Sequence, residues 1–132
     1  MNQTFPAPQK ITLRKNDGSL ELRYGNGEVA TFNAEFLRVF SPSAEVRGHG
    51  PGQEILQHNK KHVKIVSLKP AGHYALLIEF DDGHNSGIYS WAYLADLDRD
   101  REQLWRDYLD KLNTAGLSRD PEESVVKFVT PR

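Results

Sequence analysis

The chain has 132 residues and no cysteine, and its 17 Lys and Arg residues nearly balance 18 Asp and Glu residues. A chain of this length can bury the core of one domain without a disulfide, and its balanced charge gives no basic field to attract nucleic acid. No apolar run approaches the roughly 20 residues that span a bilayer, and the amino terminus MNQTFPAPQK lacks the features of a signal peptide, so we expect a cytoplasmic protein.

The amino-terminal half predicts a small antiparallel sheet. After a flexible lead-in over residues 1–7, alternating apolar residues and two turn signals favour a three-stranded β-meander over residues 10–32. Asn33 is placed to cap a short helix that runs to Phe40. That helix must end near residue 41, because Pro42 disfavours helical geometry in the residue before it.

Further strands follow in the second half. Residues 53–58, QEILQH, are compatible with one helical turn. Residues 63–68 carry β-branched side chains on both faces, which predicts a central strand. A turn at residues 70–72 then leads into a strand over residues 73–80, whose even-numbered side chains are expected to share one face. A short strand at residues 87–91 completes a second hairpin.

The carboxy-terminal region predicts an amphipathic helix from about Arg101 to Ala115. Asp100 and Gln103 resemble a capping box, and Gly116 is a typical helix stop. One face of this helix carries an apolar stripe, formed by Leu104, Trp105, Tyr108, Leu109 and Leu112. We therefore expect the helix to pack on the sheet.

These elements predict an α+β fold, namely a small, mainly antiparallel sheet domain with a packed carboxy-terminal helix. We place the domain at residues 8–116 and a tail at residues 117–132. The tail carries a small apolar patch that can dock as an edge strand or remain mobile, formed by Val125, Val126, Phe128 and Val129.

A glycine-rich stretch between residues 41 and 53 is the most distinctive local pattern. Gly48, Gly50 and Gly52 alternate with polar or cyclic residues, and Arg47 and His49 lie beside them. The pattern is not a phosphate-binding signature, and a tight turn that needs positive φ explains it more simply than an anion site does. No acid, base and nucleophile stand at a catalytic spacing, and no histidine has a carboxylate two residues later, so we predict neither an enzyme nor an iron oxygenase site.

Two stretches together resemble the DUF971 family. They are LRVFSPSAEVRGHGPG, residues 37–52, and FDDGHNSGIYSWAYL, residues 80–94. This small domain is also found at the amino terminus of gamma-butyrobetaine hydroxylase and trimethyllysine hydroxylase, and related domains are appended to some iron–sulfur scaffold ATPases. The resemblance covers about Pro8 to Gly116.

In the hydroxylases, the corresponding cysteine-rich loop and a later histidine form a structural zinc site. The resemblance places those ligand positions on Ser41, Ser43, Val46 and His84. A serine hydroxyl stays protonated near neutrality and valine has no donor atom, so we predict no tight zinc and no other cofactor. We expect Ser41 to cap a turn that starts at Pro42, and Val46 to pack inward.

The resemblance implies an accessory or protein-interaction module linked to metal-cofactor or iron–sulfur metabolism, because the hydroxylase catalytic domain does not accompany it here. The predicted surface for a protein partner or ligand consists of Arg47, His49, Gly50, Gly52, His84, Tyr89 and Trp91. One alternative is a small anion held by Arg47, His49 and the loop amides beside His84. Another is weak metal binding by His84 and His49 with a carboxylate from Glu45, Asp81 or Asp82.

Overall fold

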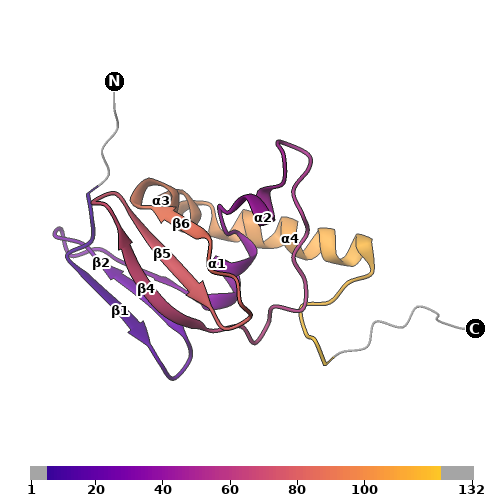
Figure 1. Cartoon of the computed structure of the whole chain (residues 1–132), viewed down its shortest axis with the longest axis horizontal. Helices are drawn as coiled ribbons and strands as arrows, with labels where there is room; N and C mark the ends of the chain where they lie inside the picture. The colour runs from indigo at the N-terminus through magenta and orange to yellow at the C-terminus, as the bar shows by residue number, and fades with distance from the viewer. Residues whose placement is uncertain (1–5, 123–132) are drawn as a thin grey trace, which may run out of the picture.

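The structure is a computed structural model that describes residues 6–122. Two antiparallel three-stranded sheets share the fold with four helices (Figure 1). The strands are β1 (Lys10–Arg14), β2 (Ser19–Arg23), β3 (Val29–Phe32), β4 (Ile65–Ala71), β5 (Ala75–Phe80) and β6 (Gly87–Ser90). The helices are α1 (Ala34–Val39), α2 (Ala44–Arg47), α3 (Trp91–Arg99) and α4 (Arg101–Ala115). The α+β class and the β-meander are confirmed.

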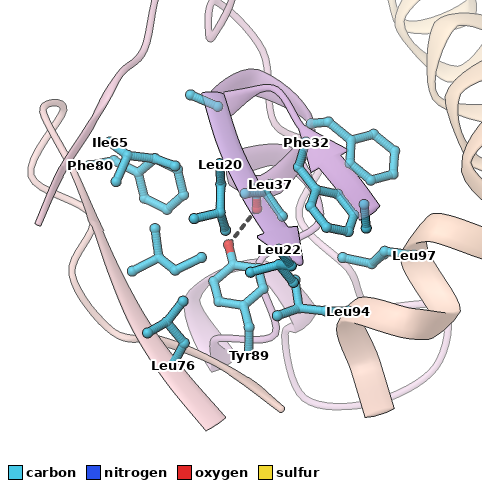
Figure 2. Packing of buried hydrophobic residues seen from close by; sticks show 14 of the residues in the cluster. Leu20, Leu22, Phe32, Leu37, Ile65, Leu76, Phe80, Tyr89, Leu94 and Leu97 are labelled. Carbon is cyan, nitrogen blue, oxygen red and sulfur yellow. Dashed lines mark hydrogen bonds between the residues drawn. The ribbon is translucent and has the colours of Figure 1, made fainter. Parts of the chain in front are cut away.

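The two sheets share one hydrophobic core. β2 contributes Leu20 and Leu22, and β5 contributes Leu76 and Ile78, each at most 3% exposed. Figure 2 shows Leu20, Leu22 and Leu76 gathered with residues of α1 and α3 around the ring of Tyr89. Burial of such side chains contributes about 1.5–3 kcal/mol each, so this cluster is the main source of stability.

Strand β4 differs from its prediction. The order β4-β5-β6 puts it at an edge of its sheet and not in the centre. The register shifts between Ile65 and Ser67, and Val66 is 59% exposed as a result. Pro70 belongs to the strand, and the turn lies two residues later than predicted, at Gly72 to Tyr74. A proline is tolerated here because an edge strand has one side without a sheet partner.

The short helix after the meander is confirmed, and the helical turn at residues 53–58 is wrong. The side chain of Asn33 accepts a hydrogen bond from the Phe36 amide, as a capping residue does. Residues 53–58 contain neither helix nor turn. The Ile55 amide instead donates to the carbonyl of Val46, at 2.8 Å, and this bond draws the segment against α2.

Helix α3 follows β6 directly and was not among the predicted elements. Ser90 caps it by accepting a hydrogen bond from the Tyr93 amide. Asp100 then ends α3 and precedes α4, with φ −101° and ψ 14°. Its carboxylate binds the Arg99 guanidinium and not the amides of α4, so the predicted capping box is wrong. Gly116 ends α4 in the left-handed region, as predicted.

Helix α4 packs beside α1 and α3. The rings of Trp105 and Phe36 lie 6.1 Å apart, and Tyr108 and Leu112 form a second small core with Val39. Leu109, predicted in the same stripe, is 39% exposed. No helix within residues 6–122 combines the length and the apolar character that crossing a bilayer requires.

The chain that follows α4 folds back onto the domain. The carbonyls of Ser118 and Arg119 accept hydrogen bonds from the amides of Asn59 and Lys61. The Arg119 guanidinium also donates two bonds, of 2.7 and 2.8 Å, to the buried carboxylate of Glu35. Residues 118 and 119 therefore contact both α1 and the connection that leads to β4. The apolar patch Val125, Val126, Phe128 and Val129 lies outside the described residues.

Candidate functional site

Pro42 ends α1, and a second short helix begins at once. The Ser43 hydroxyl caps α2 by accepting a hydrogen bond from the Glu45 amide. Ser41 supports the turn before it, because its hydroxyl accepts the Ser43 amide at 3.2 Å. Val46 is buried, as predicted. The turn and the helix thus bring three polar residues, at positions 41, 43 and 45, to one end of the domain.

A second segment, the turn after β5, meets these residues. His84 Nε2 lies 2.8 Å from Ser41 Oγ, and His84 Nδ1 lies 3.0 Å from Glu45 Oε1. Ser43 Oγ lies 2.7 Å from Ser86 Oγ. We call these five residues the His84 corner. The carboxylate can only accept, which assigns the ring proton to Nδ1 and makes Nε2 the acceptor of the Ser41 hydroxyl.

Charged groups next to the His84 corner fix the turn that carries the histidine. Asp82 accepts hydrogen bonds from Arg38 Nε, Lys60 Nζ and the His84 amide. Burial opposes ionisation of Asp82, but these three donors outweigh it and lower its pKa to about 2. For His84, burial and the Arg38 charge lower the pKa, and Glu45 only partly offsets them. The histidine is therefore neutral at pH 7.

Ser41, His84 and Glu45 have the connectivity of an acyl-transfer triad, with a hydroxyl bonded to an imidazole and the imidazole bonded to a carboxylate. The hydroxyl, however, is closed off. Ser41 is 1% exposed, and a Cβ added at Gly87 would lie 2.6 Å from Ser41 Oγ. No substrate carbonyl can reach that oxygen in this arrangement. The chain of hydrogen bonds therefore serves to hold α2 against the turn after β5.

The zinc ligand set that the family resemblance implies does not fit these residues. Three of the four ligand positions do meet, since Ser41 Oγ lies 2.8 Å from His84 Nε2 and accepts the Ser43 amide at 3.2 Å. Only His84 offers a strong donor, and both of its ring nitrogens already have partners. Within residues 6–122, no group of three or more His, Cys, Asp or Glu side chains is arranged to hold a metal ion. The alternative that combined His84 and His49 with a carboxylate would need such a group, and residues 6–122 do not form one.

The glycine-rich loop begins at Gly48, the residue that ends α2. Gly48 has φ 71°, and a Cβ at this position would lie 2.0 Å from the Gln53 carbonyl oxygen. Glycine is therefore required for the tight turn, as the sequence favoured. Arg47 and His49 are exposed, and the Arg47 guanidinium lies over the ring of Tyr93, 5.2 Å from its centre.

A groove of about 950 Å³ separates this loop from α4. Its buried lining includes Val39, Val46 and Tyr108, and its rim carries Arg47, His49 and Lys111. The glycines at positions 50 and 52 also border it. Four of the predicted surface residues, Arg47, His49, Gly50 and Gly52, are thus brought together at one accessible feature.

The other three predicted surface residues lie inside the molecule. Tyr89 is fully buried and donates its hydroxyl proton to the Leu37 carbonyl. Trp91 is 9% exposed and its Nε1 donates to the His73 carbonyl, while His84 is 4% exposed. We therefore remove Tyr89, Trp91 and His84 from the contact surface. The groove residues of α4, such as Lys111, were not predicted, because helical periodicity marks only the buried face of a helix.

Comparison with known proteins gives the family context. The family described as gamma-butyrobetaine hydroxylase-like, N-terminal, matches residues 11–95. No curated protein matches the chain. A solution NMR structure with 52% identity covers 94% of this chain and 98% of its own, with a TM-score of 0.77. A second one, with 42% identity, covers 96% and 95%, with a TM-score of 0.75.

A crystal structure from Acidithiobacillus ferrooxidans is also similar. It is described as a protein of unknown function that belongs to the DUF971 family. It is 35% identical over 69% of this chain and 91% of its own, with a TM-score of 0.57.

Proposed function

The chain belongs to the gamma-butyrobetaine hydroxylase-like, N-terminal family, and from that premise we propose that it is a non-catalytic accessory module that binds a protein partner. The contact surface is the rim of the groove, formed by Arg47, His49 and the loop glycines. The family resemblance supports a role beside metal-cofactor or iron–sulfur metabolism. That link rests on the family to which the chain belongs and not on the chemistry of the site.

The observation that carries the proposal is the contrast in accessibility along α2. The polar groups that precede the helix are buried and bonded to one another, whereas Arg47 and His49 after it are exposed beside an apolar-floored groove. Interfaces commonly combine an apolar centre with a polar rim, and arginine and tyrosine are enriched in them relative to the rest of the surface. The stacked Arg47 and Tyr93 supply such a pair.

Site-specific photo-crosslinking in the native cell extract tests this proposal. A photoreactive residue in place of His49 should give a discrete adduct that excess unlabelled protein competes away. The same residue in place of Lys10, exposed on β1, is the matched control and should give none. Identical adducts from both positions, or no competed adduct from His49, would contradict the proposal.

A small anionic ligand is the second candidate, and it is supported by two cationic side chains of a groove that Glu54 and Asp107 also line. Arg47 and Lys111 both line the groove, and neither forms an ion pair within residues 6–122. A carboxylate or phosphate bound there would meet Arg47 and the loop amides, but not His84. Titration of phosphate and citrate, followed by amide chemical shifts, should move residues 47–52 and leave His84 unshifted. No saturable shift in that loop would exclude this candidate.

A further inference from the structure

The segment from Gln53 to Gln57 has an unusual environment for its backbone. It runs without helix, turn or bend from the glycine-rich loop toward β4 and passes α4 on the way (Figure 1). An extended chain presents the N–H and C=O groups of successive residues to opposite sides. The bonds that the backbone makes at Ile55 and Gln57, but within residues 6–122 not at Glu54 and Leu56, have this alternation. It therefore has two edges, as a strand does.

One edge faces the protein and is bonded. The Ile55 amide donates to the Val46 carbonyl at 2.8 Å, and the Gln57 carbonyl accepts the Tyr108 hydroxyl at 2.8 Å. The side chain of Gln57 accepts Arg38 as well, at 3.0 Å. These contacts hold residues 55 and 57 to α1, α2 and α4, so the segment is a fixed element of the surface.

The other edge consists of the backbone groups of Glu54 and Leu56. By alternation they face away from Val46 and Tyr108, and neither residue has a backbone hydrogen bond within residues 6–122. Ile55, between them, is 55% exposed, although it is a large apolar residue. A fixed extended edge with unbonded amides and carbonyls is a template for another strand.

We propose that this edge receives an extended peptide segment of the protein partner, which pairs with Glu54 and Leu56 as an added β-strand. The inference rests on the proposed partner-binding function and specifies its mode. Main-chain bonds supply the affinity, and an apolar side chain of the partner packs on Ile55. The edge strand β4 fits this role less well, because it contains Pro70 and a register shift at Val66, which hinder edge pairing.

A tethered peptide tests the pairing. The chain has no cysteine, so a Pro51→Cys variant carries one thiol, to which the peptide Val-Thr-Val-Thr-Val-Gly-Cys is joined by a disulfide. A short tether gives an effective concentration of about millimolar, which makes weak pairing observable. Hydrogen exchange of the Glu54 and Leu56 amides should slow by about fivefold for each new bond. The Ile55 amide, already bonded to Val46, should not change.

Backbone methylation of the peptide provides the control for strand geometry. N-methylation of either the valines or the threonines should abolish protection, and methylation of the other set should preserve it, because only alternate amides face the pairing edge. Glu54→Pro, which removes an unbonded amide, should also abolish protection of Leu56, whereas Glu54→Ala should retain it. Unchanged exchange at both amides, or equal effects of the two methylation patterns, would overturn the inference.

The two proposals fail in different ways. If the peptide protects neither amide while the His49 crosslink forms equally in wild type and Glu54→Pro, strand pairing is wrong and partner binding stands. If no competed crosslink forms from His49 in the wild type, the partner-binding proposal itself is wrong.

Discussion

The His84 corner and the glycine-rich loop adjoin the two ends of the same short helix, yet polar side chains are buried in the corner and exposed in the loop. In the corner, Ser41 and His84 are almost fully buried, and each is bonded to neighbours within the chain. In the loop, Arg47 and His49 are exposed. A buried polar group is costly unless it is bonded, so the corner has a structural role, while the exposed loop is free to bind.

Loss of His84 should have the largest effect on stability. The His84→Ala variant removes the partner of the buried Ser41 hydroxyl and leaves a cavity, so we expect a loss of about 3 kcal/mol in the free energy of unfolding. Urea denaturation measures it. His73→Ala, at an exposed turn position, is the matched control and should change stability by less than about 0.5 kcal/mol. Equal effects of the two variants would remove the distinction between the corner and the surface.

Gly87→Ala should be the next most damaging change. Its Cβ would lie 2.6 Å from Ser41 Oγ and 3.0 Å from a ring carbon of Tyr89, so packing must shift at a cost of about 2 kcal/mol. Gly25→Ala is a suitable control, because its Cβ meets only the flexible side chain of Gln9. Thermal unfolding of both variants tests this. A Gly87→Ala protein as stable as the wild type would show that the corner is loosely packed.

Stability should also depend on pH through His84, with a smaller effect. Burial and Arg38 lower the pKa of His84 in the folded state below its usual value of about 6.5, so the unfolded chain takes up the proton first as the pH falls. The contribution of neutral His84 to the free energy of unfolding is therefore complete above about pH 6.5 and is lost as the pH falls below that value. His84→Gln should flatten the decline between pH 7 and pH 5 in urea titrations. An unchanged decline in that variant would contradict the assignment.

The smallest effect on stability is expected in the loop. Arg47→Ala combined with His49→Ala should change the free energy of unfolding by less than about 0.5 kcal/mol, because both side chains are exposed. The same double variant should weaken the crosslink to the partner, with the photoreactive group placed at Pro51. A large loss of stability with intact crosslinking would reverse the roles assigned to the two regions.

Local sequence patterns predicted the elements whose signals are local. The meander from 10 to 32 and the helix from Arg101 to Ala115 follow from alternation and helical periodicity. Helix α3 was missed because Trp91 was assigned to the preceding strand, although Ser90 is a capping residue and Trp91, Leu94 and Leu97 have helical spacing. Periodicity cannot show where one element gives way to the next without a loop.

The site was less predictable, for a different reason. The contact between Ser41 and His84 joins residues 43 positions apart, so no local pattern encodes it, and only the family's ligand positions brought the two together. The burial of Tyr89 was not expected either, because a short strand of alternating residues does not reveal which of its faces turns inward. Arg47 and His49 were easier to place, since charged residues beside glycines are usually exposed.

Metal content and stability under chelation test most directly whether the His84 corner is held by its own hydrogen bonds. We predict that freshly purified protein contains no stoichiometric zinc or iron, and that its unfolding midpoint is the same with and without excess EDTA. Stoichiometric metal that EDTA removes, together with a lower unfolding midpoint, would contradict this.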